Sequence, residues 1–329
     1  MRAVYYERTG PAEEVLIHAE LPDPIAGPGE VLVQVHASGI NPADVKRRAG
    51  WGGMTMQHPR VVPHCDGAGV IEAVGAGVSL DRIGQRVWLW NAQGGYGDAG
   101  RAEGTAAGRI ALPDAQAVPL PEHYDMVEGA CLGVPAMTAH RCVMSDGPVA
   151  GQTILVQGGA GAVGFLALQI AVAAGARVVT TVSSPVAADE VRAIGAIPID
   201  RHTDDVVARV LDLTDGVGVD RLIEVDFAAN QHIDARLIQP NGTIASYSSS
   251  SNAKPQLDYY AFAAKGANLR FIQGFGLPDE KRAEAVEWLE NNKLNIPIAA
   301  TLPLEDCAAA HALVEAPQAF GQVVLAVQP

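Results

Sequence analysis

The pattern of hydrophobic and polar positions changes near residue 119. Before that point, short apolar runs are interrupted by Pro and Gly. Val31, Val33 and Val35 occupy every second position of one run, which is the period of a half-buried strand. Residues 67–78 repeat small and β-branched residues around glycines, as the bends of a barrel require. We therefore predict a β-rich domain over residues 1–119.

After residue 119 the pattern alternates between strand and helix periods. Strands are expected at 153–157, 177–182, 197–199, 219–225, 243–247 and 269–273, and helices at 162–174, 185–194, 203–213 and 229–238. This alternation predicts an α/β fold with a parallel, doubly wound sheet over residues 120–275. Residues 276–329 add helices at 279–292 and 305–315 and a strand at 322–327. We expect this last segment to return to the β-rich domain.

A glycine-rich turn joins the strand at 153–157 to the helix at 162–174. Its glycines fit GxGxxG, in which the first permits a tight turn, the second lets backbone N–H groups approach a pyrophosphate, and the third allows close helix–strand packing. The start of a helix also offers unpaired N–H groups to phosphates. The turn predicts a dinucleotide site formed by Gly159, Ala160, Gly161, Ala162, Val163 and Gly164.

Composition narrows the class of protein. The 329 residues, 48% of them hydrophobic, suffice for two packed domains. A net charge of −14 opposes general binding to nucleic acids and anionic membranes. With no apolar run of membrane-spanning length and no signal-like start, a cytoplasmic protein is expected. Four scattered cysteines predict neither a disulfide framework nor a zinc knuckle.

Several short strings, together with the order of the domains, resemble the medium-chain dehydrogenase/reductase superfamily over essentially the whole chain. The strings are GINPAD (39–44), DGAGVI (66–71), GQRV (84–87), PAMTA (135–139) and GVGVD (216–220). The resemblance implies a GroES-like catalytic domain followed by a Rossmann domain that binds a nicotinamide dinucleotide.

Zinc-dependent members of this superfamily hold zinc with Cys and His at two of these places. Asn41 stands at the Cys position and Cys65 at the His position, and residues 91–105 lack the four-Cys loop. An amide is a poor zinc ligand. His64 beside Cys65 invites a metal interpretation, but neighbours on a strand point to opposite faces. We predict no bound metal, so the resemblance narrows to the zinc-independent, zeta-crystallin-like quinone oxidoreductases, which use NADPH.

Asn41 is a candidate catalytic residue. It precedes Pro42 and is expected to cap a short helix that ends at Gly50. The resemblance implies that this Asn also faces the nicotinamide. Because a capping amide can still donate to a cofactor or substrate, the two roles are compatible.

Asp44 and Lys46 are the other candidate catalytic residues. Asp44 has Arg48 four positions later, so an exposed ion pair is an equal alternative. Lys46 stands where relatives often carry a substrate-facing Tyr. An ammonium could polarise a carbonyl, although an exposed basic face shared with Arg47 and Arg48 is the favoured interpretation.

Two tryptophans are candidate walls for a flat aromatic acceptor. Trp51 and Trp90 could stack on such a ring, or could equally be core or lid aromatics. Thr138 matches a family position close to the nicotinamide.

The residues after the second nucleotide-domain strand decide between NAD and NADP. Val182 is followed by Ser183 and Ser184, so no carboxylate is present to bind a ribose 2′-hydroxyl. Arg201 stands where relatives place a Tyr against the adenosine phosphate. The two serines and Arg201 are predicted to bind that phosphate, which favours NADPH. A helix-capping Ser184 and a merely exposed Arg201 are the alternatives.

Three later residues match family positions around the cofactor, where strands of the parallel sheet end. Asp226 and Tyr247 are expected to line the cofactor cleft, and the following serines, 248–251, to form a flexible turn. Phe275 closes over the nicotinamide or simply finishes the last strand.

We therefore expect an NADPH-dependent, zinc-independent reductase of quinones or α,β-unsaturated carbonyls, with a small-molecule acceptor. One alternative is an enoyl or alkenal double-bond reductase. Another is a non-catalytic, crystallin-like NADPH-binding protein. By the resemblance, the strand around 269–272 could pair across a homodimer.

Overall fold

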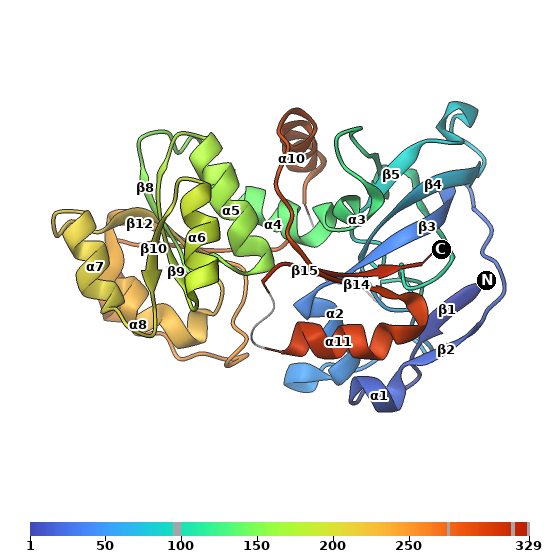
Figure 1. Cartoon of the computed structure of the whole chain (residues 1–329), viewed down its shortest axis with the longest axis horizontal. Coiled ribbons are helices and arrows are strands. Elements are labelled where there is room, and N and C mark those ends of the chain that lie inside the picture. Colours follow the sequence, from blue (N-terminus) through green and yellow to red (C-terminus); the bar gives the residue numbers. More distant parts are fainter. Residues whose placement is uncertain (95–99, 275–276, 317–319, 328–329) are drawn as a thin grey trace. The chain divides into compact units, whose positions relative to one another are not determined.

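The computed structural model describes residues 1–94, 100–274, 277–316 and 320–327. The chain forms two compact units (Figure 1). The first contains residues 1–135 and 286–329, and the second contains residues 136–285. The first boundary lies later than the expected 119/120 because α3 (Met126–Gly129) packs against strands of the first unit.

The first unit is built on a seven-stranded sheet. Its strands run in the order β14 (Ile298–Pro303), β15 (Gln322–Ala326), β3 (Glu30–Ile40), β4 (Asp66–Val74), β5 (Arg86–Leu89) and β7 (Ala117–Pro119), and β6 (Arg109–Pro113) also pairs with β3. Val31, Val33 and Val35 are fully buried, as their alternation predicts. β15 pairs antiparallel with β3, so the end of the chain completes a sheet begun near its start. A separate ribbon joins β1 (Arg2–Tyr5) and β2 (Ile17–Glu20).

Helices of the first unit connect and cover this sheet. They are α1 (Ala12–Val15), α2 (Pro42–Ala49), α3 and α11 (Cys307–Glu315). α11 contacts β14, β15, α1 and α2 (Figure 1). α2 begins after Asn41 with Pro42 in its first turn and ends at Gly50, whose φ of +72° suits glycine.

The second unit is a doubly wound parallel sheet. Its order is β10 (Ile197–Asp200), β9 (Arg177–Val182), β8 (Thr153–Val156), β11 (Val219–Glu224), β12 (Ile238–Ser246) and β13 (Asn268–Phe271). Its helices are α4 (Met137–Met144), α5 (Ala162–Ala173), α6 (Pro185–Ala193), α7 (Val206–Leu213), α8 (Phe227–Leu237) and α9 (Tyr259–Ala263), while α10 (Asp279–Asn291) spans the second boundary. The order reverses between β8 and β11, which is where ligands bind such sheets.

α5 shows why the glycine turn is followed by so apolar a helix. It packs against β8, β9 and α4, so most of its side chains are buried. Its weak amphipathicity therefore reflects enclosure rather than membrane insertion. Within the described part of the chain, no helix has the length and apolar character needed to cross a bilayer.

Candidate functional site

The glycine turn of the second unit lies between β8 and α5. Its left-handed residue is Gly158 (φ +71°) rather than Gly159, to which the sequence pattern assigned the tight turn. A Cβ on Gly159 would lie 2.0 Å from the Thr180 Oγ1 atom, and a Cβ on Gly164 would lie 2.3 Å from the Gly158 carbonyl oxygen. These two glycines are therefore required by close packing.

Gly161 leaves the start of α5 open. It is exposed and occupies the N-cap position, where the structure describes no side-chain cap. The first-turn N–H groups of α5 lack intrahelical acceptors because of their position. The turn thus offers backbone donors and the positive end of a helix dipole to an anion.

A hydrogen-bonded chain beneath the turn fixes its position. The Gly158 N–H donates to the Thr181 hydroxyl (2.9 Å), which donates to the Gln157 side-chain oxygen (2.9 Å). The Gln157 amide in turn donates to the Asp234 carboxyl (3.2 Å). Burial raises the pKa of Asp234 well above its usual value, and neighbouring Glu224, whose own pKa is raised by burial, adds to the effect. The two carboxyls therefore favour a shared proton.

The ends of β9 and β10 bring the predicted phosphate-binding residues together. The Arg201 N–H donates to the Val182 carbonyl (3.0 Å), which places Arg201 beside exposed Ser183. The Arg201 side chain is exposed and has no hydrogen-bond or ion-pair partner among the described residues. Ser184 caps α6 by accepting from the Ala187 N–H (3.2 Å). One cation, two hydroxyls and the carboxylates of Asp200 and Asp204 therefore border this edge.

Asp226 has a local structural task. Its carboxylate accepts from the Ser251 N–H (3.0 Å) and from the Ser251 hydroxyl (2.9 Å). The Phe227 N–H donates to the Ser248 carbonyl (3.0 Å), so the serine run expected to be a flexible turn is bonded to the start of α8. The Tyr247 N–H donates to the Glu224 carbonyl (3.1 Å), and burial raises the pKa of the Tyr247 phenol well above its usual value. This phenol is therefore neutral at physiological pH.

Thr138 lies in α4 and is buried. A Cβ on Gly274 would approach its hydroxyl to 2.7 Å, so the chain after β13 passes against Thr138. Phe275, the next predicted cofactor residue, lies outside the described residues.

Asn41 and two carboxyl groups form a buried polar cluster in the first unit. The Asn41 amide donates to the Asp66 carboxyl (2.8 Å), and the Asn41 N–H donates to the Asp44 carboxyl (2.8 Å). The Val134 N–H also donates to Asp66 (2.8 Å). Asp66 was not singled out from the sequence, although it begins β4 directly after Cys65. Its partner Asn41 is separated from it by the whole α2 segment.

Burial changes the acid–base behaviour of this cluster. It raises the pKa of Asp44 to about 6, although bonds from Asn41 and the charge of Arg47 oppose the shift. It raises the pKa of Asp66 well above the usual range. Burial likewise raises the pKa of the Cys65 thiol, which therefore stays protonated. Asp44 can thus exchange a proton near neutral pH, whereas Asp66 favours its neutral form.

The basic residues of α2 do not form the exposed face that was expected. Arg48 is buried and pairs with Glu315 of α11 (2.7 Å), so it does not form the anticipated exposed pair with Asp44. Lys46 is half-buried, and its ammonium lies over the Trp51 ring, 4.8 Å from the centroid. A cation held on an indole face is a defined, partly desolvated donor.

Trp90 is a buried residue of the first unit. Only 5% of it is exposed, and its indole N–H donates to the Ala115 carbonyl (3.4 Å). The core-aromatic interpretation therefore suits Trp90, whereas Trp51 is only half-buried.

The positions that bind zinc in related dehydrogenases carry other interactions here. The Asn41 amide is engaged with Asp66, and the Cys65 thiol donates to the Gln93 side-chain oxygen (3.7 Å). His64 is directed elsewhere, to Ser38 and His311. Although His64 and Cys65 are neighbours in the chain, their side chains therefore have different partners and do not form one site.

Comparisons with known proteins agree with this division. Family models match residues 27–122 (alcohol dehydrogenase GroES-like domain) and residues 162–291 (zinc-binding dehydrogenase). The quinone oxidoreductase of Homo sapiens is 30% identical over 320 residues, covering 87% of this chain and 93% of the human protein. A solved NAD-dependent alcohol dehydrogenase covers all of both chains with a TM-score of 0.89 and 28% identity. A mycobacterial protein solved with NADPH has a TM-score of 0.86 and 27% identity, covering 99% of this chain and 100% of the other.

Proposed function

The chain belongs to the quinone oxidoreductase branch of the medium-chain dehydrogenase/reductase superfamily and is a nicotinamide-dependent oxidoreductase, and from this premise we propose that it uses NADPH to reduce quinones or α,β-unsaturated carbonyls. The observation that carries the proposal is the open glycine turn before α5 together with Arg201 at the neighbouring strand ends.

The second unit supplies the residues that fit a dinucleotide phosphate. The uncapped start of α5 and exposed Gly161 suit the pyrophosphate. Arg201 supplies a guanidinium for the 2′-phosphate, and Ser183 adds a hydroxyl beside it. No carboxylate follows Val182 to repel that phosphate. These features support NADPH rather than NADH, although one structural relative carries an NAD-dependent name.

The first unit supplies donors suited to a delocalised acceptor. NADPH provides the hydride when bound. Reducing a quinone or enone spreads negative charge over a conjugated system, so modest hydrogen-bond donors stabilise it. We propose that the Asn41 amide and the Lys46 ammonium serve as these donors and that the Trp51 ring offers a stacking face. Asp44, with its pKa of about 6, can accept or release a proton near neutral pH.

An enoyl or alkenal double-bond reductase is the alternative within the same chemistry. It uses the same hydride donor and the same oxyanion donors, and differs in the acceptor carbon. Rates of NADPH oxidation measured separately with a quinone and with an alkenal distinguish the two activities.

We also propose a homodimer through β13. This strand lies at the edge of the parallel sheet, and Phe271 on it is 71% exposed. An exposed edge strand with an apolar side chain favours pairing with a second copy. Light scattering would give twice the chain mass, and Phe271→Glu should yield the monomer. A wild-type protein that stays monomeric at micromolar concentration would contradict this proposal.

The cofactor assignment is tested by calorimetric titration of the purified protein with NADPH and NADH. Tighter binding of NADPH, followed by its oxidation on addition of 1,4-benzoquinone, is the expected result. Tighter NADH binding would overturn the cofactor assignment, and NADPH binding without turnover on any quinone or enone would overturn the reaction.

A further inference from the structure

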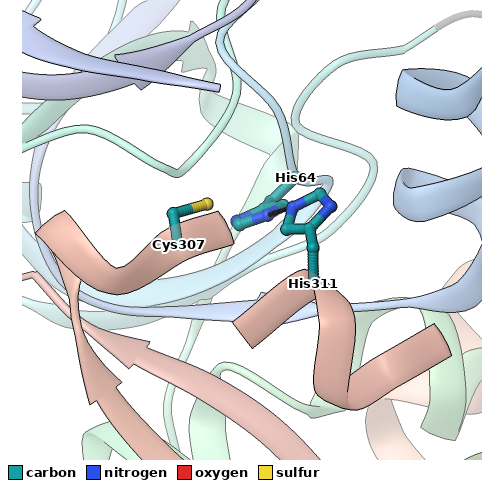
Figure 2. Close-up of side chains that lie close together, drawn as sticks. All are labelled: His64, Cys307 and His311. Atoms are coloured by element: carbon teal, nitrogen blue, oxygen red, sulfur yellow. Dashed lines mark hydrogen bonds between the residues drawn. The ribbon is translucent and has the colours of Figure 1, made fainter. Parts of the chain in front are cut away.

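A second group of titratable side chains lies in the first unit and has no part in the proposed reaction. Figure 2 shows His64 together with Cys307 and His311. All three are buried, and one potential ligand atom from each lies within 4.8 Å of the others. Cys307 and His311 are four residues apart on α11, so they project from one helix face.

The hydrogen bonds around His64 determine which of its nitrogens carries the lone pair. The Thr105 hydroxyl donates its proton to the Asp66 carbonyl (2.5 Å), so it accepts from Ser38 (2.7 Å). The Ser38 hydroxyl proton is thereby used, and Ser38 accepts from the His64 Nδ1–H (2.8 Å). Neutral His64 therefore accepts the Nε2–H of His311 at its own Nε2 (2.8 Å), and a metal ion bound by both Nε2 atoms would shift the His311 proton to its Nδ1, which is unpartnered among the described residues.

This arrangement matches the way proteins prepare a histidine to bind a metal. A metal-binding imidazole usually donates its other ring N–H to a fixed acceptor, which sets its tautomer and orientation. Ser38 fills that role for His64. In addition, His64 is a non-glycine residue at a φ of +81°, and such strained backbone concentrates at functional sites. The Nδ1 of His311 is buried without a hydrogen-bond partner among the described residues.

We propose that His64, His311 and Cys307 bind one thiophilic d10 metal ion, with monovalent copper as the preferred occupant. Two imidazoles and a thiolate are soft or borderline ligands that suit Cu⁺ and Zn²⁺. In a buried site, a single positive charge is neutralised by the thiolate, whereas Zn²⁺ would leave an uncompensated charge. The Arg48 guanidinium also acts on Cys307 and His311, but its charge is balanced by Glu315 (2.7 Å).

Ion binding at this site must release one proton. A cysteine binds a metal ion as the thiolate, whereas a histidine binds it as the neutral imidazole. The thiol gives its proton to solvent as the sulfur–metal bond forms. Affinity should therefore rise about tenfold for each pH unit in the neutral range.

A bound ion would cross-link distant parts of the first unit. His64 precedes β4, whereas α11 follows β14 near the end of the chain. The proposal replaces the expectation of a metal-free protein, which was based on Asn41, Cys65 and the absence of a four-Cys loop at residues 91–105. It leaves the catalytic positions without a metal.

The test is an anaerobic titration of the full chain with Cu⁺ against a chromogenic Cu⁺ chelator, with a parallel Zn²⁺ titration. One Cu⁺ per chain is expected, with Zn²⁺ bound more weakly. Cys307→Ser and His311→Gln should lose the ion, and Ser38→Ala should weaken it roughly 10- to 100-fold. Cys142→Ser, in the second unit, and His123→Gln, at an exposed position, are matched controls that should bind as wild type.

Four results would overturn the proposal. The site is excluded if neither ion binds stoichiometrically. It is also excluded if Cys307→Ser and His311→Gln, shown to be folded by circular dichroism, both still bind the ion. Affinity that does not change with pH would exclude the thiolate. Tighter binding of Zn²⁺ than of Cu⁺ would refute the assignment to monovalent copper.

Discussion

At the scale of single residues, we propose that Arg201 sets the preference for NADPH. Its guanidinium is exposed at the end of β10, and its backbone is bonded to the end of β9. A charge-assisted contact is worth roughly 1.5–3 kcal/mol, so Arg201→Ala should weaken NADPH binding about 10- to 100-fold while leaving NADH binding unchanged. Calorimetric titration measures both. Arg209→Ala, at another exposed arginine of the second unit, is the control, and equal loss of both dinucleotides in Arg201→Ala would remove the proposed role.

Asn41 is expected to matter more for turnover than for folding. Removing its amide leaves Asp66 with one fewer donor and costs about 1–3 kcal/mol of stability. Losing a positioned donor at a reacting centre can cost on the order of 100-fold in rate. Asn41→Ala should therefore lower kcat about 100-fold in steady-state assays.

The matched control for this effect is Asp205→Ala, which removes the cap bond to the Ala208 N–H of α7 (3.0 Å). It should lower thermal stability with kcat unchanged. An Asn41 variant that behaves in the same way would show that Asn41 only caps α2.

At the scale of elements, the capping box of α2 makes folding stability depend on pH. Asp44 ionises near its ordinary value of 3.8 in the unfolded chain and at about 6 in the folded protein. Between these values the folded state binds more protons, so this group's contribution to the free energy of unfolding falls as the pH rises. From about pH 4.5 to about pH 7 the loss is roughly 2 kcal/mol.

Asp44→Asn removes the titration and keeps an oxygen that can accept from the Asn41 N–H. Urea unfolding of both proteins at the two pH values should therefore show wild type losing stability relative to the variant as the pH rises. A stability difference that stays constant would mean that Asp44 has an ordinary pKa.

Two substitutions in the glycine turn should differ in their effect on stability. Gly164→Ala drives a Cβ to 2.3 Å from the Gly158 carbonyl oxygen, so both stability and dinucleotide binding should fall. Gly161→Ala has an ordinary φ of −78° and a 3.3 Å contact. It should fold normally and mainly impair approach of the pyrophosphate. Thermal melts and NADPH titrations compare the two, and equal stability of both variants would contradict the packing argument.

At the scale of the whole molecule, local signals account for most of the fold. Strand–helix alternation predicts the six-stranded parallel sheet, and Asn41, Pro42 and Gly50 predict the limits of α2, because capping and periodicity act over a few residues. Contacts between distant segments are not predicted, because they join residues that lie far apart in the chain. The Arg48–Glu315 pair joins residues 267 positions apart, and His64 meets His311 across 247 positions.

The same distinction applies to the candidate site. Asn41 and the turn before α5 follow from motifs, whereas the role of Asp66 emerges only when β4 pairs with β3. A family position likewise does not predict that the Asp226 carboxylate accepts from the Ser251 N–H. Sequence reasoning therefore predicted the local turn before α5 and the cap of α2 better than the three-dimensional polar networks around them.

We propose that this oxidoreductase passes a hydride from NADPH to a conjugated acceptor without a catalytic metal. The most direct measurement compares kcat/KM for 2-cyclohexenone and 1,4-benzoquinone with that for cyclohexanone, each with NADPH and with a chelator present. The conjugated acceptors should be favoured at least about tenfold, because their reduction spreads the developing charge. Efficient reduction of cyclohexanone with both conjugated acceptors inert, or loss of all activity to the chelator and its recovery with zinc, would contradict the account.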